Sequence, residues 1–164
     1  MSRLIGIAAV QMEPAAWEPE ASVAEIARSF PWVQLVVFHE LAVSGAVPFA
    51  PAGPPAFARQ AAQPIPGPLT SALCAVARRW GKWLVPGSLY ERDGQAIYNT
   101  ALAISPAGEI VARYRKLFPW LPFEAETAAG DEFCVFDIPE AGRFGLCICY
   151  DQWFPEAARM ARLA

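Results

Sequence analysis

The segment Gly142–Glu156 reads GRFGLCICYDQWFPE and decides how the rest of the chain is interpreted. Its apolar first half predicts a strand over Arg143–Cys149, and Asp151 indicates a turn directly afterwards. Pro155-Glu156 then begins a helix, because proline suits the first helical position. Cys149 is therefore expected at a strand end, held by the sheet but open to its surroundings. With backbone N–H groups following it, this position suits a nucleophile beside an oxyanion site.

Composition limits the classes of protein that the chain can represent. Its 164 residues are 55% hydrophobic and 18% charged, which predicts a single globular domain over residues 1–164 rather than a disordered chain. The net charge of −3, with no basic run, argues against a nucleic-acid partner. No apolar stretch has the length of a membrane span, and Leu4–Val10 reads as a buried first strand rather than a signal peptide.

The cysteines indicate a reducing compartment and no metal site. Cys147 and Cys149 are too close in sequence for an ordinary disulfide with each other. The chain has a single histidine and no CxxC pair, so a zinc site is not expected. The thiols are read as reduced, in a cytosolic protein, and Cys74 and Cys134 as inert buried side chains.

Strands and helices alternate in the first part of the chain and strands follow one another in the second, which predicts an α/β sheet covered by helices. The expected strands are Leu4–Val10, Val33–Phe38, Trp83–Tyr90, Ala96–Ser105, Glu109–Arg115, Phe133–Ile138 and Arg143–Cys149, with a hairpin turn at Asp93-Gly94. The expected helices are Glu20–Phe30, Leu69–Trp80 with Gly81 as its cap, and one that begins at Pro155.

Two long loops and the end of the chain complete this outline. Seven prolines between Val47 and Pro68 predict a loop with one helical turn near Phe57–Ala62, which is either a functional lid or a surface excursion. Leu117–Gly130 is expected to be irregular. The last helix reaches Ala164 without a closing glycine or proline, which suggests a chain cut inside such a domain.

Three polar residues follow apolar strands: Glu40, Lys116 and Cys149. Strand ends at one edge of an α/β sheet are where active sites gather. Each residue alone has a structural explanation, as a solvated carboxylate, a surface charge or a core thiol. Together they make a chemically complete set for attack of a thiol on an unactivated carbonyl.

Such an attack needs a base for the thiol proton, positive charge for the oxyanion and a proton for the leaving group. Glu40 can serve as the base and then as the acid. Lys116 and the backbone N–H of Tyr150 can form the oxyanion site. The only histidine, His39, offers a rival base for Cys149, as in Cys–His hydrolases.

Four segments carry a resemblance to a known family. They are FHE at Phe38–Glu40, YNTALAISPAGEIVARYRK at Tyr98–Lys116, YRKLFPWLPFE at Tyr114–Glu124, and CYDQWFPE at Cys149–Glu156. Together they resemble the nitrilase, or carbon–nitrogen hydrolase, superfamily. Lys116 follows Glu40 by 76 residues and Cys149 follows Lys116 by 33 residues, which suits the Glu-Lys-Cys triad of that family.

The resemblance implies an α-β-β-α sandwich whose C-terminal part is missing from this chain, and assembly as a homo-oligomer. Cys149 would attack an amide or nitrile carbon with Glu40 as base and Lys116 as the oxyanion-stabilising cation. Glu124 falls where family amidases carry a second glutamate that positions substrate and water. The intermediate would be a thioester, ammonia or an amine would be released, and no metal or organic cofactor would be needed.

Within the family, Cys149-Tyr150-Asp151 and the WLPFE segment favour a small-molecule amidase over a nitrilase, which more often has Trp-Glu after the cysteine. N-carbamoyl or N-acyl hydrolysis or transfer stays open, as does an inactive truncated homologue that acts by pairing with another chain. Trp120 and Trp153 either line the acyl pocket or pack the loops. Asn99 is expected to make a structural hydrogen bond, and Asp151 to cap the turn or helix.

Overall fold

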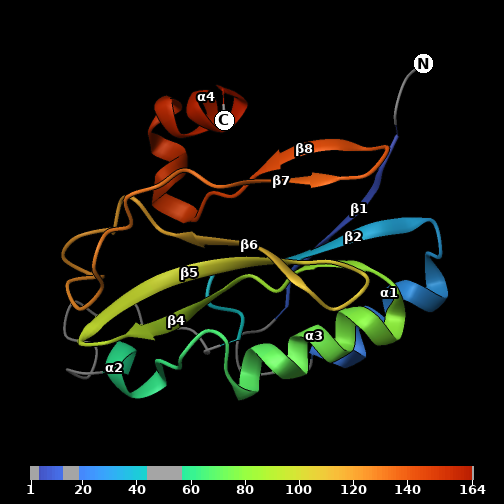
Figure 1. The fold of residues 1–164 in the computed structure, drawn as a ribbon, viewed down its shortest axis with the longest axis horizontal. Coiled ribbons are helices and arrows are strands. Elements are labelled where there is room, and N and C mark those ends of the chain that lie inside the picture. Colours follow the sequence, from blue (N-terminus) through green and yellow to red (C-terminus); the bar gives the residue numbers. More distant parts are fainter. Residues whose placement is uncertain (1–3, 13–18, 44–56, 164) are drawn as a thin grey trace.

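The computed structural model describes residues 4–12, 19–43 and 57–163. Its centre is a six-stranded sheet in the order β1-β2-β3-β5-β4, in which β6 also pairs with β5 (Figure 1). The strands are β1 (Gly6–Val10), β2 (Val33–Phe38), β3 (Trp83–Val85), β4 (Ser88–Asp93), β5 (Ala96–Ile104) and β6 (Ile110–Arg115). β1, β2 and β3 are parallel, and β4, β5 and β6 form an antiparallel meander.

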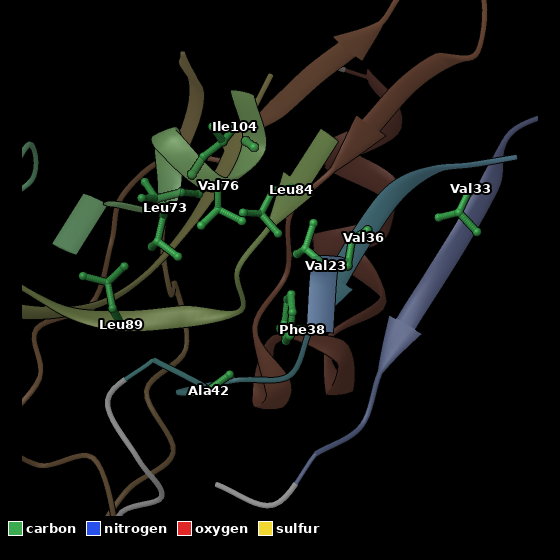
Figure 2. Close-up of a cluster of buried hydrophobic side chains, with 12 residues drawn as sticks. Val23, Val33, Val36, Phe38, Ala42, Leu73, Val76, Leu84, Leu89 and Ile104 are labelled. Carbon is green, nitrogen blue, oxygen red and sulfur yellow. The ribbon is translucent and has the colours of Figure 1, made fainter. Parts of the chain in front are cut away.

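Helices α1 (Pro19–Ser29) and α3 (Pro68–Trp80) cover one face of this sheet, and α2 (Phe57–Ala61) lies beside β4 (Figure 1). Each long helix directs its apolar side chains at the sheet, as helical periodicity requires. Figure 2 shows Val23 of α1 and Val76 of α3 gathered with Leu84 of β3 in this core. Gly81 ends α3 in the left-handed conformation, as the sequence predicts.

A second layer lies on the opposite face of the sheet. It consists of the hairpin β7 (Val135–Ile138) and β8 (Gly142–Gly145), followed by the short 3-10 helix η2 (Cys149–Trp153) and helix α4 (Pro155–Leu163) (Figure 1). Phe136 and Ile138 of β7 pack with Ala103 and Tyr114 of the large sheet. The layers thus follow the expected α-β-β-α order.

The expected strand over Trp83–Tyr90 is wrong as a single element. The chain bends at Pro86-Gly87 and forms β3 and β4, which occupy successive positions along β5. Gly87 has a φ of 78°, a left-handed conformation that breaks a strand, and Pro86 has no N–H to donate to a sheet. The bend carries the chain past the end of β2.

The expected strand over Arg143–Cys149 is too long, because β8 ends at Gly145. Leu146 still donates its N–H to the Cys134 carbonyl, at 3.1 Å. The N–H of Ile148 donates to the buried carboxylate of Asp151 instead, at 2.9 Å. That side chain converts the end of the strand into the turn of η2.

The other expected elements are found, with boundaries shifted by a few residues at most. The helical turn expected near Phe57–Ala62 is α2, and the Asp93-Gly94 hairpin joins β4 to β5. Residues 47–56 of the expected proline-rich loop lie outside the described residues. None of the helices in the described part of the chain is long and apolar enough to cross a membrane.

Gly87 offers a test of the bend that separates β3 from β4. A Cβ atom there would lie 2.0 Å from the His39 carbonyl oxygen, whereas a Cβ at Gly94, also at positive φ, would meet nothing within 4 Å. We expect Gly87→Ala to lower the free energy of unfolding by at least about 3 kcal/mol. The matched Gly94→Ala variant should cost about 1–2 kcal/mol. Urea denaturation measures both, and equal losses would contradict the close approach.

Candidate active site

The site is built around the ammonium group of Lys116, which directly follows β6. Its side chain is 1% exposed, and Nζ donates to Oε1 of Glu40 at 2.9 Å and to Oε2 of Glu124 at 2.6 Å. Burial alone would lower the pKa of Lys116, but the hydrogen bonds and charges of the two carboxylates outweigh it and raise the pKa. Lys116 is therefore held as a cation between two acids.

Glu40 lies in a tight turn that follows β2. The N–H of Leu41, which has a φ of 54°, donates to Oγ of Ser88 at 3.0 Å, and the Ala42 N–H donates to the His39 carbonyl at 3.3 Å. Since Gly87 touches the same carbonyl, the bend between β3 and β4 holds this turn in place. The general-base candidate is thus positioned by two strands rather than by a free loop.

Glu124 comes from the irregular loop after β6, and its carboxylate is fully engaged. Besides Lys116, Oε2 accepts the backbone N–H of Trp120 at 2.7 Å. The loop returns to the sheet at Gly130, whose N–H donates to the Lys116 carbonyl at 2.8 Å. A Cβ at Gly130 would lie 2.3 Å from the Arg115 carbonyl oxygen, so glycine permits this approach.

Asn99 of β5 is a member of this cluster that the sequence did not reveal. Its Nδ2 donates to Oε1 of Glu40 at 2.8 Å and to Oε1 of Glu124 at 2.9 Å, and the residue is 1% exposed. The Asn99 carbonyl accepts the N–H of Lys116 at 2.9 Å, so the two residues are neighbours across the sheet. A hydrogen bond was expected for Asn99, but its partners depend on a strand register that the sequence does not specify.

Cys149 is the first residue of η2 and is exposed, with a φ of 43°. This left-handed conformation is uncommon for a residue with a side chain and is typical of functional sites. Burial raises the pKa of the Cys149 thiol, the charge and hydrogen bond of Glu40 raise it further, and the charge of Lys116 lowers it. At neutral pH the resting group is therefore a thiol beside a carboxylate.

Asp151 holds the cysteine turn, as its expected capping role requires. Its carboxylate is 0% exposed and accepts the Tyr114 hydroxyl at 2.7 Å and the Phe118 N–H at 3.0 Å, in addition to the Ile148 N–H. One side chain thus joins β6, the loop after Lys116 and the cysteine turn. A carboxylate so fully used is a structural cap rather than a reacting group.

A cavity of about 510 Å³ opens beside Cys149 and Glu40. Gln152 supplies a further polar side chain to its wall. The rest of the lining is mainly apolar and comes from both layers, including Val37 of β2 and Phe136 of β7. A small neutral molecule that reached the thiol through this cavity would meet few charged groups besides Glu40.

Tyr150, Trp120 and Trp153 form an aromatic cluster next to the cysteine turn. The centroid of the Tyr150 ring lies 6.4 Å from that of Trp120 and 6.0 Å from that of Trp153. The ring centroids of Trp120 and Phe123 are 4.4 Å apart. Trp153 is 79% exposed. None of the three lines the cavity described above. Their contact with substrate therefore stays a prediction.

His39 lies next to Glu40 in the wall of the cavity. Its Nδ1 is 2.9 Å from the Glu40 carbonyl oxygen, which can only accept, so Nδ1 carries the proton. Nε2 is buried and has no hydrogen-bond partner among the described residues. Glu40 and Lys116, but not His39, are among the groups that set the pKa of Cys149.

The remaining cysteines do not join this cluster. Cys74 and Cys134 are partly buried, and burial raises the pKa of both thiols, which fits the inert role expected for them. Cys147 is exposed and lines the cavity, and burial and the charge of Asp151 raise its pKa. Over the described residues, no group of three or more His, Cys, Asp or Glu side chains could hold a metal ion.

Comparison with known proteins establishes the family. The sequence profile of the carbon–nitrogen hydrolases matches residues 6–164. The chain therefore belongs to the carbon–nitrogen hydrolase family, as the motifs around Glu40, Lys116 and Cys149 indicated.

Individual relatives agree with this assignment. The chain is similar to a formamidase of Bacillus cereus (strain Q1), with 43% identity over 99 residues, or 59% of this chain and 30% of the relative. A carbon–nitrogen hydrolase from Helicobacter pylori G27 superposes with a TM-score of 0.77 at 24% identity, over 95% of this chain and 55% of the other. A cysteine-to-alanine variant of the Nesterenkonia AN1 amidase superposes with a TM-score of 0.75 at 27% identity, over 96% of this chain and 60% of the amidase. The chain thus spans less than two thirds of the length of each relative.

The opposed effects of Glu40 and Lys116 on the thiol can be measured directly. We expect Glu40→Gln to lower the pKa of Cys149, because the nearby negative charge is lost, and Lys116→Met to raise it. The ultraviolet absorbance of the thiolate, followed against pH and compared with a Cys149→Ala blank, reports this titration.

Lys82→Met is the matched control. Lys82 is also a buried lysine, but its Nζ donates to the carbonyls of Pro31 and Val33 and makes no salt bridge with a carboxylate of the described residues. Its loss should leave the titration of Cys149 unchanged. Shifts of the same sign in Glu40→Gln and Lys116→Met would contradict the electrostatic description of the site.

Proposed function

We propose that the protein hydrolyses carbon–nitrogen bonds of small amides, with Cys149 as the nucleophile. The observation that carries the proposal is the Lys116 ammonium, which joins the Glu40 and Glu124 carboxylates beside an exposed thiol. A formamidase and an amidase are among its relatives. In a structure of a glutamate-to-glutamine variant of the Nesterenkonia amidase, similar at 25% identity with a TM-score of 0.77, acrylamide has added to the active-site cysteine.

The proposed reaction begins with proton transfer. Glu40 accepts the proton of the Cys149 thiol as the sulfur attacks the amide carbon, which avoids a free thiolate at rest. The C=O electrons move to oxygen, and the developing oxyanion is stabilised by the Lys116 charge and the Tyr150 N–H. Collapse of this intermediate breaks the C–N bond, and the proton held by Glu40 goes to the departing ammonia or amine.

The resulting thioester is then hydrolysed. Water attacks the acyl carbon while Glu40 again accepts a proton, and the thiol is regenerated with release of the carboxylic acid. Glu124 positions substrate and water, since its own carboxylate is held by Lys116, Asn99 and the Trp120 N–H. No step requires a metal or an organic cofactor.

The amide is favoured over the nitrile by the Cys149-Tyr150-Asp151 segment and by the identity of the relatives. Trp120 and Trp153 are proposed to contact the acyl group. We further propose a cytoplasmic homo-oligomer, because the thiols are unpaired and large aromatic side chains such as Trp153 are exposed. Sedimentation velocity would reveal the oligomer, and a purely monomeric protein would contradict it.

A panel of short aliphatic amides, N-carbamoyl compounds and nitriles tests the reaction. We expect ammonia release from the amides by the protein at its full natural length, and loss of this release in Cys149→Ala. Preference for carbamoyl compounds or nitriles would move the assignment to those classes. Release that persists in Cys149→Ala would contradict a thiol mechanism.

Two neighbouring variants separate the candidate bases. Glu40→Gln should lower turnover by at least about 10²-fold, because the general base is lost. His39→Gln should retain most of the activity, because the ring donates to a backbone carbonyl rather than to the thiol. The reverse pattern would favour the Cys–His alternative. If no substrate is turned over, iodoacetamide should still alkylate Cys149 faster than Cys74 and Cys134, and equal rates would favour a non-catalytic chain.

A further inference from the structure

Asn99 is the feature of the site that the proposed chemistry has not used. It is the neighbour of Lys116 across the sheet, on β5, and its Nδ2 is shared between Glu40 and Glu124. Lys116 and Asn99 each contact both carboxylates, so the four polar groups form a closed ring of hydrogen bonds. Of the two donors in this ring, Lys116 is charged and Asn99 is neutral.

The orientation of the amide follows from charge. Turning it over would place Oδ1 against the two carboxylate oxygens, where only repulsion is available. With Nδ2 toward the carboxylates, Oδ1 is buried and has no hydrogen-bond partner among residues 4–12, 19–43 and 57–163. The side chain therefore leaves its own acceptor unused in order to donate to both acids.

The two donors of Glu40 also define which oxygen remains for chemistry. Lys116 and Asn99 both bond to Oε1, at 2.9 and 2.8 Å, so neither occupies Oε2. If the carboxylate rotates, Oε1 loses its hydrogen bonds from both Lys116 and Asn99, so the carboxylate is held in one orientation. This carboxylate also hydrogen-bonds with the thiol of Cys149.

We propose that Asn99 is a positioning residue that aims the Glu40 carboxylate at Cys149. This inference rests on the proposed function, because Glu40 is the base of that reaction. A neutral donor suits the role: a second cation would over-neutralise the pair of acids, and an acceptor would repel them. Asn99 acts through Glu40 and does not itself touch the substrate.

The groups that face Glu40 come from each element packed around it. They are Lys116 after β6, Glu124 in the following loop, Cys149 in η2, His39 in the same turn and Tyr90 of β4, which pairs with Asn99. Burial, followed by the charges of Glu124 and Glu40, raises the pKa of Tyr90, which stays neutral at physiological pH. Of these groups, Lys116 alone is a permanent cation. Without Asn99, Lys116 would be the one remaining donor of the two that bond to Oε1 of Glu40.

The test compares Asn99→Leu, which keeps the shape but removes the donor, with Thr100→Val. Thr100 is the next residue of β5, is 0% exposed and donates to a different buried carboxylate, Glu91, at 2.7 Å. Asn99→Leu removes two hydrogen bonds to carboxylates and Thr100→Val removes one, all from the same strand, but only those of Asn99 belong to the site. If Asn99→Leu does not fold, as judged by circular dichroism, the smaller Asn99→Ala supplies the same comparison.

We expect Asn99→Leu to lower kcat on the order of 10- to 100-fold with little change in KM, because the base is misaligned and substrate contacts are retained. A change in kcat without a change in KM is the signature of a misaligned base, because a general loss of structure would also weaken substrate binding. Thr100→Val should keep the wild-type kcat and KM.

The rate at which iodoacetamide alkylates Cys149 at one fixed pH, followed by peptide mass spectrometry, gives a readout that needs no amide substrate. We expect slower alkylation in Asn99→Leu, because Glu40 is no longer held toward the thiol, and an unchanged rate in Thr100→Val. An unchanged kcat and an unchanged alkylation rate in folded Asn99→Leu would overturn the role of Asn99 while leaving amide hydrolysis intact. A wild-type protein without amide hydrolysis would overturn the proposed function, and the alkylation rates would still decide on Asn99.

Discussion

A buried ammonium between two carboxylates is the interaction on which the site depends. Lys116 is almost completely removed from solvent, and this burial is tolerable only because Glu40 and Glu124 accept hydrogen bonds from its ammonium group, at 2.9 and 2.6 Å. The same contacts place one carboxylate beside the thiol of Cys149 and the other in the loop after β6. Stability and chemistry thus rest on one cation, because removing it would leave two acids facing each other in the interior.

The fold supplies this arrangement through strand ends that meet at one place. Glu40 follows β2, Lys116 follows β6 and Cys149 follows the hairpin of the second layer, so three separate elements each contribute one group. Close backbone contacts fix them: Gly87 against the His39 carbonyl, and Gly130 against the Arg115 carbonyl. Asp151 joins the cysteine turn to Tyr114 at the end of β6. Rigid attachment of this kind is what general-base catalysis requires of its groups.

Much of this could be predicted from local signals. Strand and helix types, the Asp93-Gly94 hairpin and the candidates Glu40, Lys116 and Cys149 follow from apolar periodicity and motif spacing, which are properties of the chain in one dimension. A Pro-Gly pair is itself a turn signal, but apolar residues stand on both sides of Pro86-Gly87, and their pattern favours one strand over two. The end of β8 is set by the side chain of Asp151, which accepts the N–H of Ile148. Asn99 could not be assigned its partners, since they depend on its register opposite Lys116 and on a turn 59 residues earlier.

If this cluster makes Cys149 the nucleophile, the thiol becomes acylated during turnover, and this acyl-enzyme can be trapped. Protein mixed with a short aliphatic amide would be quenched with acid and its peptides analysed by mass spectrometry. We expect an acyl group on the Cys149 peptide that neutral hydroxylamine removes, as is typical of a thioester. Turnover without any adduct on Cys149, or an acyl group on another residue, would contradict it.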